Sequence, residues 1–369
     1  MNITLVNFIV VIVLAIIFSS SGNSNTNKKY YIWSVLFWLL LETALRGLSV
    51  GSDTLSYYEM FNHTAYRTDW SEIFTMFIDT YIDQANEEDI GYLLLQKIIS
   101  IFTTNWNVFV FISGLLFYVP LGFLLYRYCK TFWHITIALL IFVALFQIIP
   151  LSGGRQLQAM GLCIVSFLYM DKEKYWKSIV FVLIGAFIHK SCLLCLLPIA
   201  LSKIKPSLLK KIHIIAYFMI PIAVRFASQI IVFMGESIGS EKYANYGMRS
   251  VQGDAVVFLA LLELVSLFLF IGIKRRDLEN NQTLLKLYTM VPFFTVFGTF
   301  IYFNGSMIRV SMYFHLYIMM LIPYTIDLLF KKSNVTVYYL FVVLLLFFAL
   351  RSSGLSYYFF WNDPYFVTF

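Results

Sequence analysis

Four arginines lie at the ends of, or inside, apolar stretches that are long enough to cross a membrane. Arg46, Arg155 and Arg309 fall at predicted outer ends of helices, and Arg225 falls in the outer half of another helix. A guanidinium group offers a planar fork of donors that binds phosphate in two places and keeps its proton. Because burying such a charge is costly unless an anion meets it, these arginines predict an anionic ligand. The alternative, that they extend to lipid headgroups, stays open.

The surroundings of three of these arginines differ. In "SGGRQLQA", Arg155 follows two glycines at a predicted helix N-terminus, where free N–H groups also favour anions. In "NGSMIRVSMYFH", Arg309 follows a break that contains glycine, and Tyr313 lies one turn further along the same face. For Arg46 an ion pair with Glu42, one turn earlier, is an alternative to a ligand.

Two residues are rival candidates for a base that takes a hydroxyl proton. His189 and Lys190 are the ionisable residues of the apolar segment "FVLIGAFIHKSCLLCLLPI", and ionisable groups at such depth are functional candidates. A lone histidine there can also be a packing residue. Asp53, in "VGSDT", is the rival base, because nearby arginines would keep its carboxylate ionised. The sequence leaves this choice open.

The elements that position these residues are predicted to be membrane-spanning helices. Of the 369 residues 60% are hydrophobic and 13% charged, too few polar residues to cover a water-soluble surface. A membrane span needs about 20 apolar residues and must satisfy its own backbone hydrogen bonds. We therefore expect an all-α polytopic integral membrane protein, a single transmembrane domain over 1–369, with about ten spans. They are predicted at 3–19, 30–47, 106–128, 132–150, 155–171, 212–234, 255–273, 285–303, 307–330 and 335–351.

The basic residues indicate the orientation of these helices. The net charge of +7 is carried mainly by short lysine-rich clusters between apolar runs, the pattern of cytoplasmic loops rather than of a nucleic-acid-binding protein. The segment 178–202 has such a cluster at each end, so we expect a broken, re-entrant pair of half-helices that turns near 185–191. A plain crossing is the alternative. The four cysteines, Cys129, Cys163, Cys192 and Cys195, are interpreted as core residues, and no metal site is expected.

The segment 48–105 is then an external loop. It is rich in aspartate and glutamate, and its later part, "IGYLLLQKIISIF", has the spacing of an amphipathic helix on the membrane surface. In this part the apolar positions are Leu93, Leu94, Ile98 and Ile101 or Phe102. We interpret the segment as a lid over the site.

Five motifs in order along the chain resemble those of the EpsG-like family of Wzy-type bacterial polysaccharide polymerases. They are "LRGLSVGSDTLSYYEMF", "DIGYLLLQKIISIF", "SGGRQLQAMGLCIVSFLYM", "FVLIGAFIHKSCLLCLLPI" and "IRVSMYFHLYIMMLIPY". Related polymerases are similar to the GT-C class of membrane glycosyltransferases, so the resemblance implies that architecture. The site residues that it implies are Arg46, Asp53, Tyr57, Arg155, Gln156, His189, Lys190 and Arg309.

The resemblance implies an enzyme on the outer face of the bacterial cytoplasmic (inner) membrane that joins oligosaccharide repeat units carried on undecaprenyl pyrophosphate. The partners are then a carrier-linked donor, a carrier-linked acceptor and membrane lipid, and a chain-length regulator protein is a candidate partner. Arg46 would face the pyrophosphate, while Tyr57 and Tyr58 would contact sugars, whose rings have apolar faces.

Fixed arginines stabilise a departing pyrophosphate without a general acid, so we expect a metal-independent, cofactor-free single displacement with inversion. A glycan ligase of the O-antigen type is the nearest alternative, since it uses the same donor. A lipid-linked oligosaccharide flippase should carry charges in both leaflets, and an acyltransferase should place its histidine toward the cytosol. A purely structural membrane protein has no need of several outer arginines.

Overall fold

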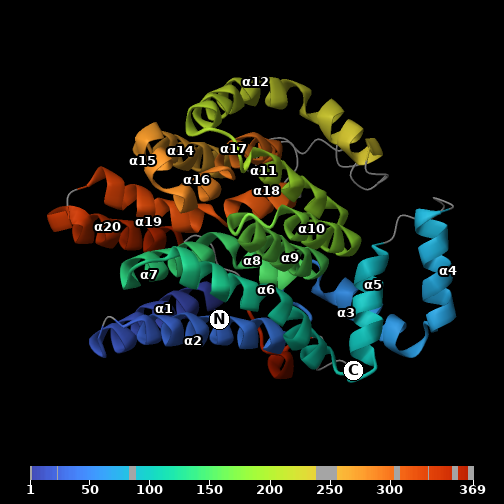
Figure 1. Ribbon diagram of the computed structural model, residues 1–369. Helices are drawn as coiled ribbons and strands as arrows, with labels where there is room; N and C mark the ends of the chain where they lie inside the picture. Colours follow the sequence, from blue (N-terminus) through green and yellow to red (C-terminus); the bar gives the residue numbers. More distant parts are fainter. Residues whose placement is uncertain are drawn as a thin grey trace. The chain divides into compact units, whose positions relative to one another are not determined.

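The computed structural model of the protein describes residues 2–22, 24–82, 89–237, 256–302, 308–330, 332–350 and 356–364 (Figure 1). Within these residues the regular secondary structure is helical and no β-strand occurs, which confirms the all-α class. The chain forms two compact units. Unit 1 comprises 1–168, 180–193 and 336–369, and unit 2 comprises 169–179 and 194–335.

Four helical segments among the described residues are long and apolar enough to cross a membrane. They are α1 (Ile3–Ser20), α6 (Trp106–Tyr128), α12 (Pro206–Ser237) and the stretch Gln282–Tyr302. A fifth span results if α18 (Ile308–His315) and α19 (Ile318–Leu329), which are bent by 41° at their junction, count as one. The protein is therefore a membrane protein, whereas the predicted number of about ten spans is not confirmed.

One predicted span does not form a continuous helix. The run 132–150 divides into α7 (Phe132–Ile141), the π-helical turn η1 (Phe142–Phe146) and α8 (Ile148–Ser152). The run 285–303 also changes its hydrogen-bond pattern, from α16 (Gln282–Tyr288) through α17 (Val291–Gly298) to the 3-10 turn η3 (Thr299–Tyr302), but it still counts as one of the four spans. Hydropathy registers how apolar a run is but not where its hydrogen-bond pattern changes, and such changes are frequent near functional sites.

In unit 1, α2 (Asn25–Leu45) packs against both α1 and α6 (Figure 1). Helices α2 and α6 run antiparallel. At one end the Asn107 side chain donates to the Ala44 carbonyl over 2.6 Å, and at the other the Lys28 ammonium donates to the Lys130 carbonyl over 2.9 Å. Arg46 therefore lies at the opposite end of this helix pair from the Lys28–Lys130 contact.

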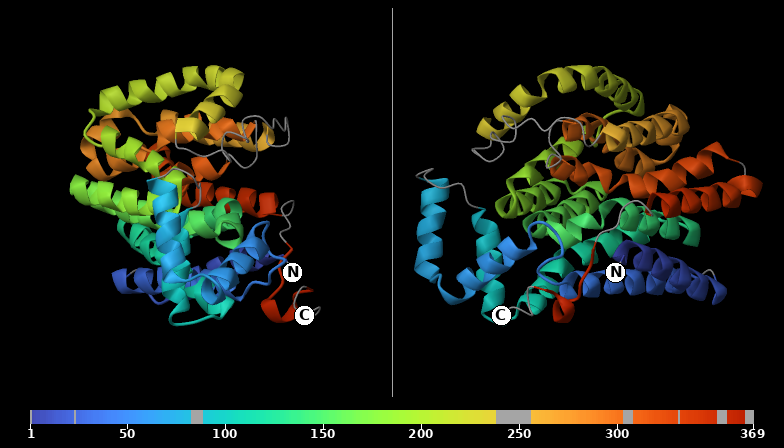
Figure 2. Two further views of the ribbon diagram at one scale, coloured as in Figure 1. Left: turned by 90° about the vertical axis from the view of Figure 1, so that its right-hand side faces the viewer. Right: turned by 180° about the vertical axis from the view of Figure 1, so that it is seen from behind.

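The predicted external loop is itself helical. It contains α3 (Thr54–Tyr66), α4 (Trp70–Tyr81) and α5 (Ile90–Ser100), of which α5 packs on α3, α4 and α6 (Figure 2). The predicted amphipathic helix corresponds to α5. Of its predicted apolar positions, Ile98, Ile101 and Phe102 are exposed, whereas Leu93 is buried together with Tyr92 and Gln96. Its place on the membrane surface stays a prediction. The role of the segment as a lid stays a prediction.

The predicted break between 185 and 191 is found. Helix α10 (Tyr175–Ile188) ends before His189, and the 3-10 turn η2 (Lys190–Cys195) follows, leading into α11 (Leu196–Leu201). Because the segment 178–202 begins in unit 2, runs through unit 1 and returns to unit 2, its re-entrant course stays a prediction.

Unit 2 has a polar chain among its helices. The His213 ring on α12 is bonded through Nδ1 to the Tyr288 hydroxyl at 2.6 Å and through Nε2 to the Ser266 hydroxyl at 3.0 Å. Ser266 lies on α14 (Val256–Gly272), and its hydroxyl also pairs with that of Thr295 on α17 at 2.6 Å. These hydrogen bonds join the four helices α12, α14, α16 and α17 in the interior of the unit.

Candidate functional site

Three ionisable side chains from separate parts of unit 1 meet at one place. One Asp89 carboxylate oxygen lies 2.8 Å from Nη1 of Arg155 and 3.4 Å from Nδ1 of His189. Asp89 precedes α5, Arg155 is in the first turn of α9 (Gly154–Asp171), and His189 follows α10. Their side chains are 11%, 22% and 14% exposed, so all three are largely buried without being closed off. We call these three residues the charged cluster.

Close backbone packing explains how the cluster forms. A side chain at Gly91, in the first turn of α5, would place its Cβ 2.3 Å from the Phe187 carbonyl oxygen near the end of α10. Glycine at this position lets the start of α5 rest directly on α10. Since Asp89 and His189 each lie two residues from this contact, the contact sets their carboxylate and ring side by side.

The electrostatics of Asp89 agree with an ion pair. Burial is the largest single influence on its carboxyl and raises the pKa. The hydrogen bond with His189 and the positive charges of Arg155 and Lys190 outweigh that effect and hold the pKa of Asp89 below its usual range. Asp89 is therefore a carboxylate at neutral pH. Nε of Arg155 is buried and has no hydrogen-bond partner among the described residues, so donors of this guanidinium remain for a ligand.

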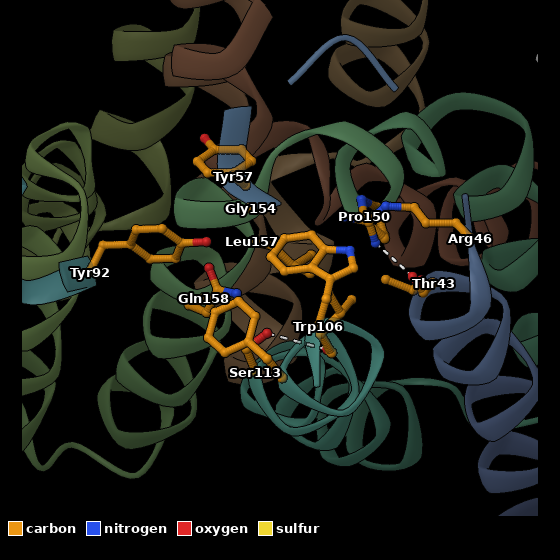
Figure 3. Close-up of a pocket in the computed structure, with 12 residues that line it drawn as sticks. Thr43, Arg46, Tyr57, Tyr92, Trp106, Ser113, Pro150, Gly154, Leu157 and Gln158 are labelled. Carbon is orange, nitrogen blue, oxygen red and sulfur yellow. Dashed lines mark hydrogen bonds between the residues drawn. The ribbon is translucent and has the colours of Figure 1, made fainter. Parts of the chain in front are cut away.

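A pocket next to the charged cluster is shown in Figure 3. Its cavity volume is about 10 Å³, the space that about one water molecule needs. Tyr57 joins the two features, because its ring lines the pocket and lies 5.9 Å from the Arg155 guanidinium carbon. The full lining is Thr43, Arg46, Tyr57, Tyr92, Trp106, Phe109, Val110, Ser113, Pro150, Gly154, Leu157 and Gln158.

Arg46 lines this pocket from the end of α2. It is only 3% exposed, and it donates to the Thr43 carbonyl over 2.6 Å and to the Thr54 hydroxyl over 3.3 Å. The Glu42 carboxylate accepts hydrogen bonds from the Asn7 and Gln147 amides. Arg46 thus reaches the site, but two of its nitrogens are held by the protein.

The turn between α2 and α3 needs a glycine at Gly51, because of the backbone conformation and the close packing there. Gly51 has a φ of +85°, and a Cβ there would lie 2.1 Å from the Leu151 carbonyl oxygen. The turn carries Asp53 to the start of α3, where the Ser52 hydroxyl donates to its carboxylate over 3.1 Å. Asp53 is not among the residues that line the pocket.

The other predicted residues of unit 1 have varied positions. Tyr58 packs edge-on against Trp106, with ring centroids 5.8 Å apart, and does not line the pocket. Gln156 is buried and also lies outside the lining, whereas Gln158, two residues on, is part of it. Lys190 adjoins the charged cluster and contributes to the electrostatics of Asp89.

Three predicted residues belong to unit 2 and are described there alone. Arg225 is exposed on α12 beside the kink at Phe226, with its guanidinium carbon 5.7 Å from that ring. Arg309 is half-buried on α18, and Tyr313, one turn later, is 2% exposed. Their part in the same site as Arg155 stays a prediction.

Four functional candidates were not predicted as site residues. Asp89, Trp106 and Gln158 are brought to the site by packing between distant segments. Asp363 near the C-terminus is fully buried, and its carboxylate accepts from the Ser49 backbone N–H over 2.9 Å and from the Ser49 hydroxyl over 2.8 Å. The "DIGY" motif around Asp89 was a usable signal, because an acidic residue directly precedes a helix whose first turn contains glycine.

The cysteines behave as core residues, since all four are buried free thiols. In unit 1 the sulfurs of Cys163 and Cys192 lie 2.8 Å apart. The expectation that the protein uses no metal stays a prediction.

Comparison with protein families agrees with the resemblance of the motifs. The model of the EpsG family matches residues 29–363, a range that includes the charged cluster, the pocket and Asp363. This family is associated with polysaccharide polymerase glycosyltransferase activity. The comparison with curated proteins and the comparison with solved structures each found no match. Because the match extends over nearly the whole chain, the protein belongs to the EpsG family.

Proposed function

We propose that the protein polymerises oligosaccharide repeat units carried on undecaprenyl pyrophosphate, at the outer face of the bacterial cytoplasmic membrane. The observation that carries the proposal is the charged cluster, which stands beside a pocket lined by aromatic and polar side chains. A glycosyl pyrophosphate needs both features, because its leaving group is anionic and its sugars have apolar faces and hydroxyls.

Arg155 is the group that would stabilise the leaving pyrophosphate. It stands in the first turn of α9, where backbone N–H groups also favour an anion. Its ion pair with Asp89 fixes the guanidinium in place, while its Nε remains without a partner among the described residues. A donor that is fixed before the reaction stabilises developing charge without having to reorganise.

His189 is the group that would take the proton of the acceptor hydroxyl. When Asp89 accepts a hydrogen bond from Nδ1–H, the ring is held in the tautomer whose lone pair is on Nε2. This arrangement favours His189 over Asp53 as the base, with Asp89 as its positioning residue. The alternative hypothesis, that Asp53 is the base, is tested by the same polymerisation assay as the assignment of His189.

The reaction balances as a single displacement. The acceptor oxygen forms a bond to the anomeric carbon as its proton passes to His189, and the bond from that carbon to the pyrophosphate oxygen breaks with its electron pair. The products are a glycan longer by one repeat unit and undecaprenyl pyrophosphate. Attack opposite the leaving group inverts the anomeric centre.

The charge distribution of unit 1 supports the outer location of the site. Helices α2 and α6 have Lys28 and Lys130 at one end and the pocket residues Arg46 and Trp106 at the other. Lysine-rich ends face the cytoplasm. The charged cluster is then on the extracytoplasmic side.

The test is a polymerisation assay with the purified full-length protein and the carrier-linked repeat unit isolated from the source cell. We expect a ladder of products from the wild type, and loss of the ladder in Arg155→Ala and His189→Ala. Arg127→Ala is the matched control, because it removes an exposed arginine from the lysine-rich end of α6 and should leave the ladder intact.

Each result has a distinct meaning. An active Arg155→Ala or His189→Ala variant would remove these residues from the mechanism, and loss of activity in Asp53→Ala alone would make Asp53 the base. A single transfer without a ladder would indicate a glycan ligase. Activity lost in chelator and restored by a divalent cation would refute metal independence.

A further inference from the structure

We propose that one face of α4 is a platform for the growing glycan, on which sugar rings stack against Trp70, Phe74 and Phe77. We call these three residues the aromatic stripe. The partner is an uncharged stretch of the polymer, away from the bond that forms. The inference rests on the proposed function, because it names where the product of that reaction is held.

The aromatic stripe is exposed although it consists of large apolar side chains. Positions 70, 74 and 77 have the i, i+4, i+7 spacing, so the three rings share one side of α4. Trp70 is 49% exposed, Phe74 66% and Phe77 38%. Helix α4 packs on α5, and the residues that it buries include Ile73 and Thr80. A row of exposed aromatic rings outside the core indicates an interaction surface.

The aromatic stripe lies outside the layer of the spanning helices. Helix α5 packs on α6, and α4 packs on α5. In Figures 1 and 2, α4 is the outermost of the described helices at this end of unit 1. Because a helix with its side chains is about 10 Å across, α4 stands about one helix diameter beyond the end of α6. The stripe is then exposed to water rather than to acyl chains.

The charges around α4 disfavour an anionic partner. From Thr68 to Gln96 the chain has no lysine, arginine or histidine, and Glu72 in the first turn of α4 is exposed. A phosphate, an acidic polymer or an anionic lipid surface would meet only negative charge there. An uncharged glycan fits, because its sugar rings have apolar faces that pack on aromatic rings while their hydroxyls stay in water.

The aromatic stripe leads to the charged cluster. The Phe77 ring packs against the Phe187 ring with centroids 6.3 Å apart, and Phe187 lies two residues before His189. The Phe187 carbonyl is also the atom that Gly91 approaches at the start of α5. A glycan that extends from a sugar at His189 therefore passes first over Phe77 and then over Phe74 and Trp70.

The first experiment measures the length of the products. It uses the purified full-length protein in nanodiscs and the carrier-linked repeat unit isolated from the source cell. Trp70→Ala and Phe74→Ala each remove one exposed ring of the stripe. Phe102→Ala is the matched control, because it removes a ring that is 81% exposed just after α5, and thermal unfolding midpoints verify folding.

We expect both stripe variants to join the first two repeat units at the wild-type rate and to lose the longest products. The reason is that the platform holds the polymer between additions and does not touch the bond that forms. Phe102→Ala should give the ladder of the wild type. Products of wild-type length from both stripe variants, or equal shortening by Phe102→Ala, would overturn the assignment.

The second experiment follows Trp70 directly by fluorescence. Its emission is the difference between the wild type and Trp70→Phe. The probes are acrylamide in water, brominated phosphatidylcholine in the nanodisc, and the oligosaccharide released from the isolated carrier-linked repeat unit. We expect quenching by acrylamide, none by the brominated lipid, and saturable protection from acrylamide by the oligosaccharide. Phe74→Ala should raise the concentration needed for protection roughly 3- to 10-fold.

The remaining outcomes assign the aromatic stripe to another partner. Quenching of Trp70 by the brominated lipid would place the stripe in the bilayer. Protection that depends on protein concentration, with no effect of the oligosaccharide, would make it a contact between two copies of this chain. Either result would overturn the glycan platform.

The ladder of the wild type separates this inference from the proposed function. A wild type that forms no ladder refutes the proposed function. A wild-type ladder that both stripe variants reproduce at full length refutes the glycan platform alone.

Discussion

Both units contain histidines in apolar surroundings, but their environments differ. His189 in unit 1 follows a helix end, is 14% exposed, and faces a carboxylate that also binds an arginine. His213 in unit 2 lies within a helix, is fully buried, and pairs through both ring nitrogens with the hydroxyls of Tyr288 and Ser266.

The comparison separates a reactive histidine from a packing histidine. A partly exposed ring that faces a carboxylate can gain and lose a proton during a reaction. A ring enclosed by neutral hydroxyls has its hydrogen bonds satisfied, and charging it would require taking a cation out of water. The apolar sequence around each histidine is similar, so the charged partners and the exposure are what distinguish them.

The largest effect is expected at Asp89. Asp89→Asn removes the charge that holds both Arg155 and His189 and no longer selects the tautomer of the imidazole. The polymerisation rate should fall on the order of 100-fold or more. The measurement is the initial rate of ladder formation, with Asp79→Asn on α4 as the matched control for loss of a carboxylate from the segment 48–105. A rate within about twofold of wild type would make the cluster a structural ion pair.

The opposite pattern is expected for His213. His213→Phe removes the two hydrogen bonds that the ring forms with the Tyr288 and Ser266 hydroxyls, and should lower the free energy of unfolding by about 1–3 kcal/mol. The specific activity of the folded variant should match the wild type. Denaturant unfolding and the ladder assay together test this expectation. A stable but inactive His213→Phe variant would erase the contrast between the two histidines.

A smaller effect on the rate is expected at Asp363. Its carboxylate holds Ser49 in the turn that carries Arg46 and Asp53, and a Cβ on Gly47 would lie 1.9 Å from a carboxylate oxygen of Asp363. Asp363→Ala should loosen this turn and reduce the rate by roughly 10-fold, since it acts on positioning alone. Ser49→Ala, which keeps the backbone N–H, should cost less than Asp363→Ala. If Asp363→Ala has no effect on the rate, the C-terminal segment does not organise the site.

The smallest effect is a dependence of stability on acid pH. The pKa of Asp89 is lowered in the folded protein, so its ion pairs contribute stability that is fully present above the unfolded value of about 3.9. This contribution is lost as the pH falls through the lower, folded value. The unfolding midpoint of the wild type should therefore exceed that of Asp89→Asn at pH 7, and the difference should shrink below about pH 4. A difference that grows with acid would contradict the ion pair.

Part of the site was predictable from sequence because its residues stand out within apolar runs. Arg155 after two glycines and His189 at a helix break are local signals, and the structure brings these two side chains to the same carboxylate. Asp89 was not identified because the segment 48–105 is rich in acidic residues and sequence alone does not tell which one meets an arginine. That choice is made by the contact of Gly91 with Phe187, which joins segments almost 100 residues apart.

The fold was predictable in the same uneven way. The all-α class follows from the apolar runs, and the helix break near His189 follows from the basic clusters at both ends of the segment 178–202. The structure has both features. The number of spans was harder to predict, because a turn such as the π-helical η1 divides a run of uniform hydropathy. Trp106 and Gln158 are ordinary residues of apolar helices until α6 and α9 bring them to the same pocket.

The most direct test of the central claim is a cryo-electron microscopy structure of the full-length protein in nanodiscs with undecaprenyl pyrophosphate. We predict that the diphosphate binds at the N-terminus of α9, within hydrogen-bond distance of the Arg155 guanidinium and beside Asp89 and His189. A diphosphate bound instead at the Lys28–Lys130 end of unit 1, or within unit 2 alone, would contradict the assignment of the charged cluster as the catalytic site.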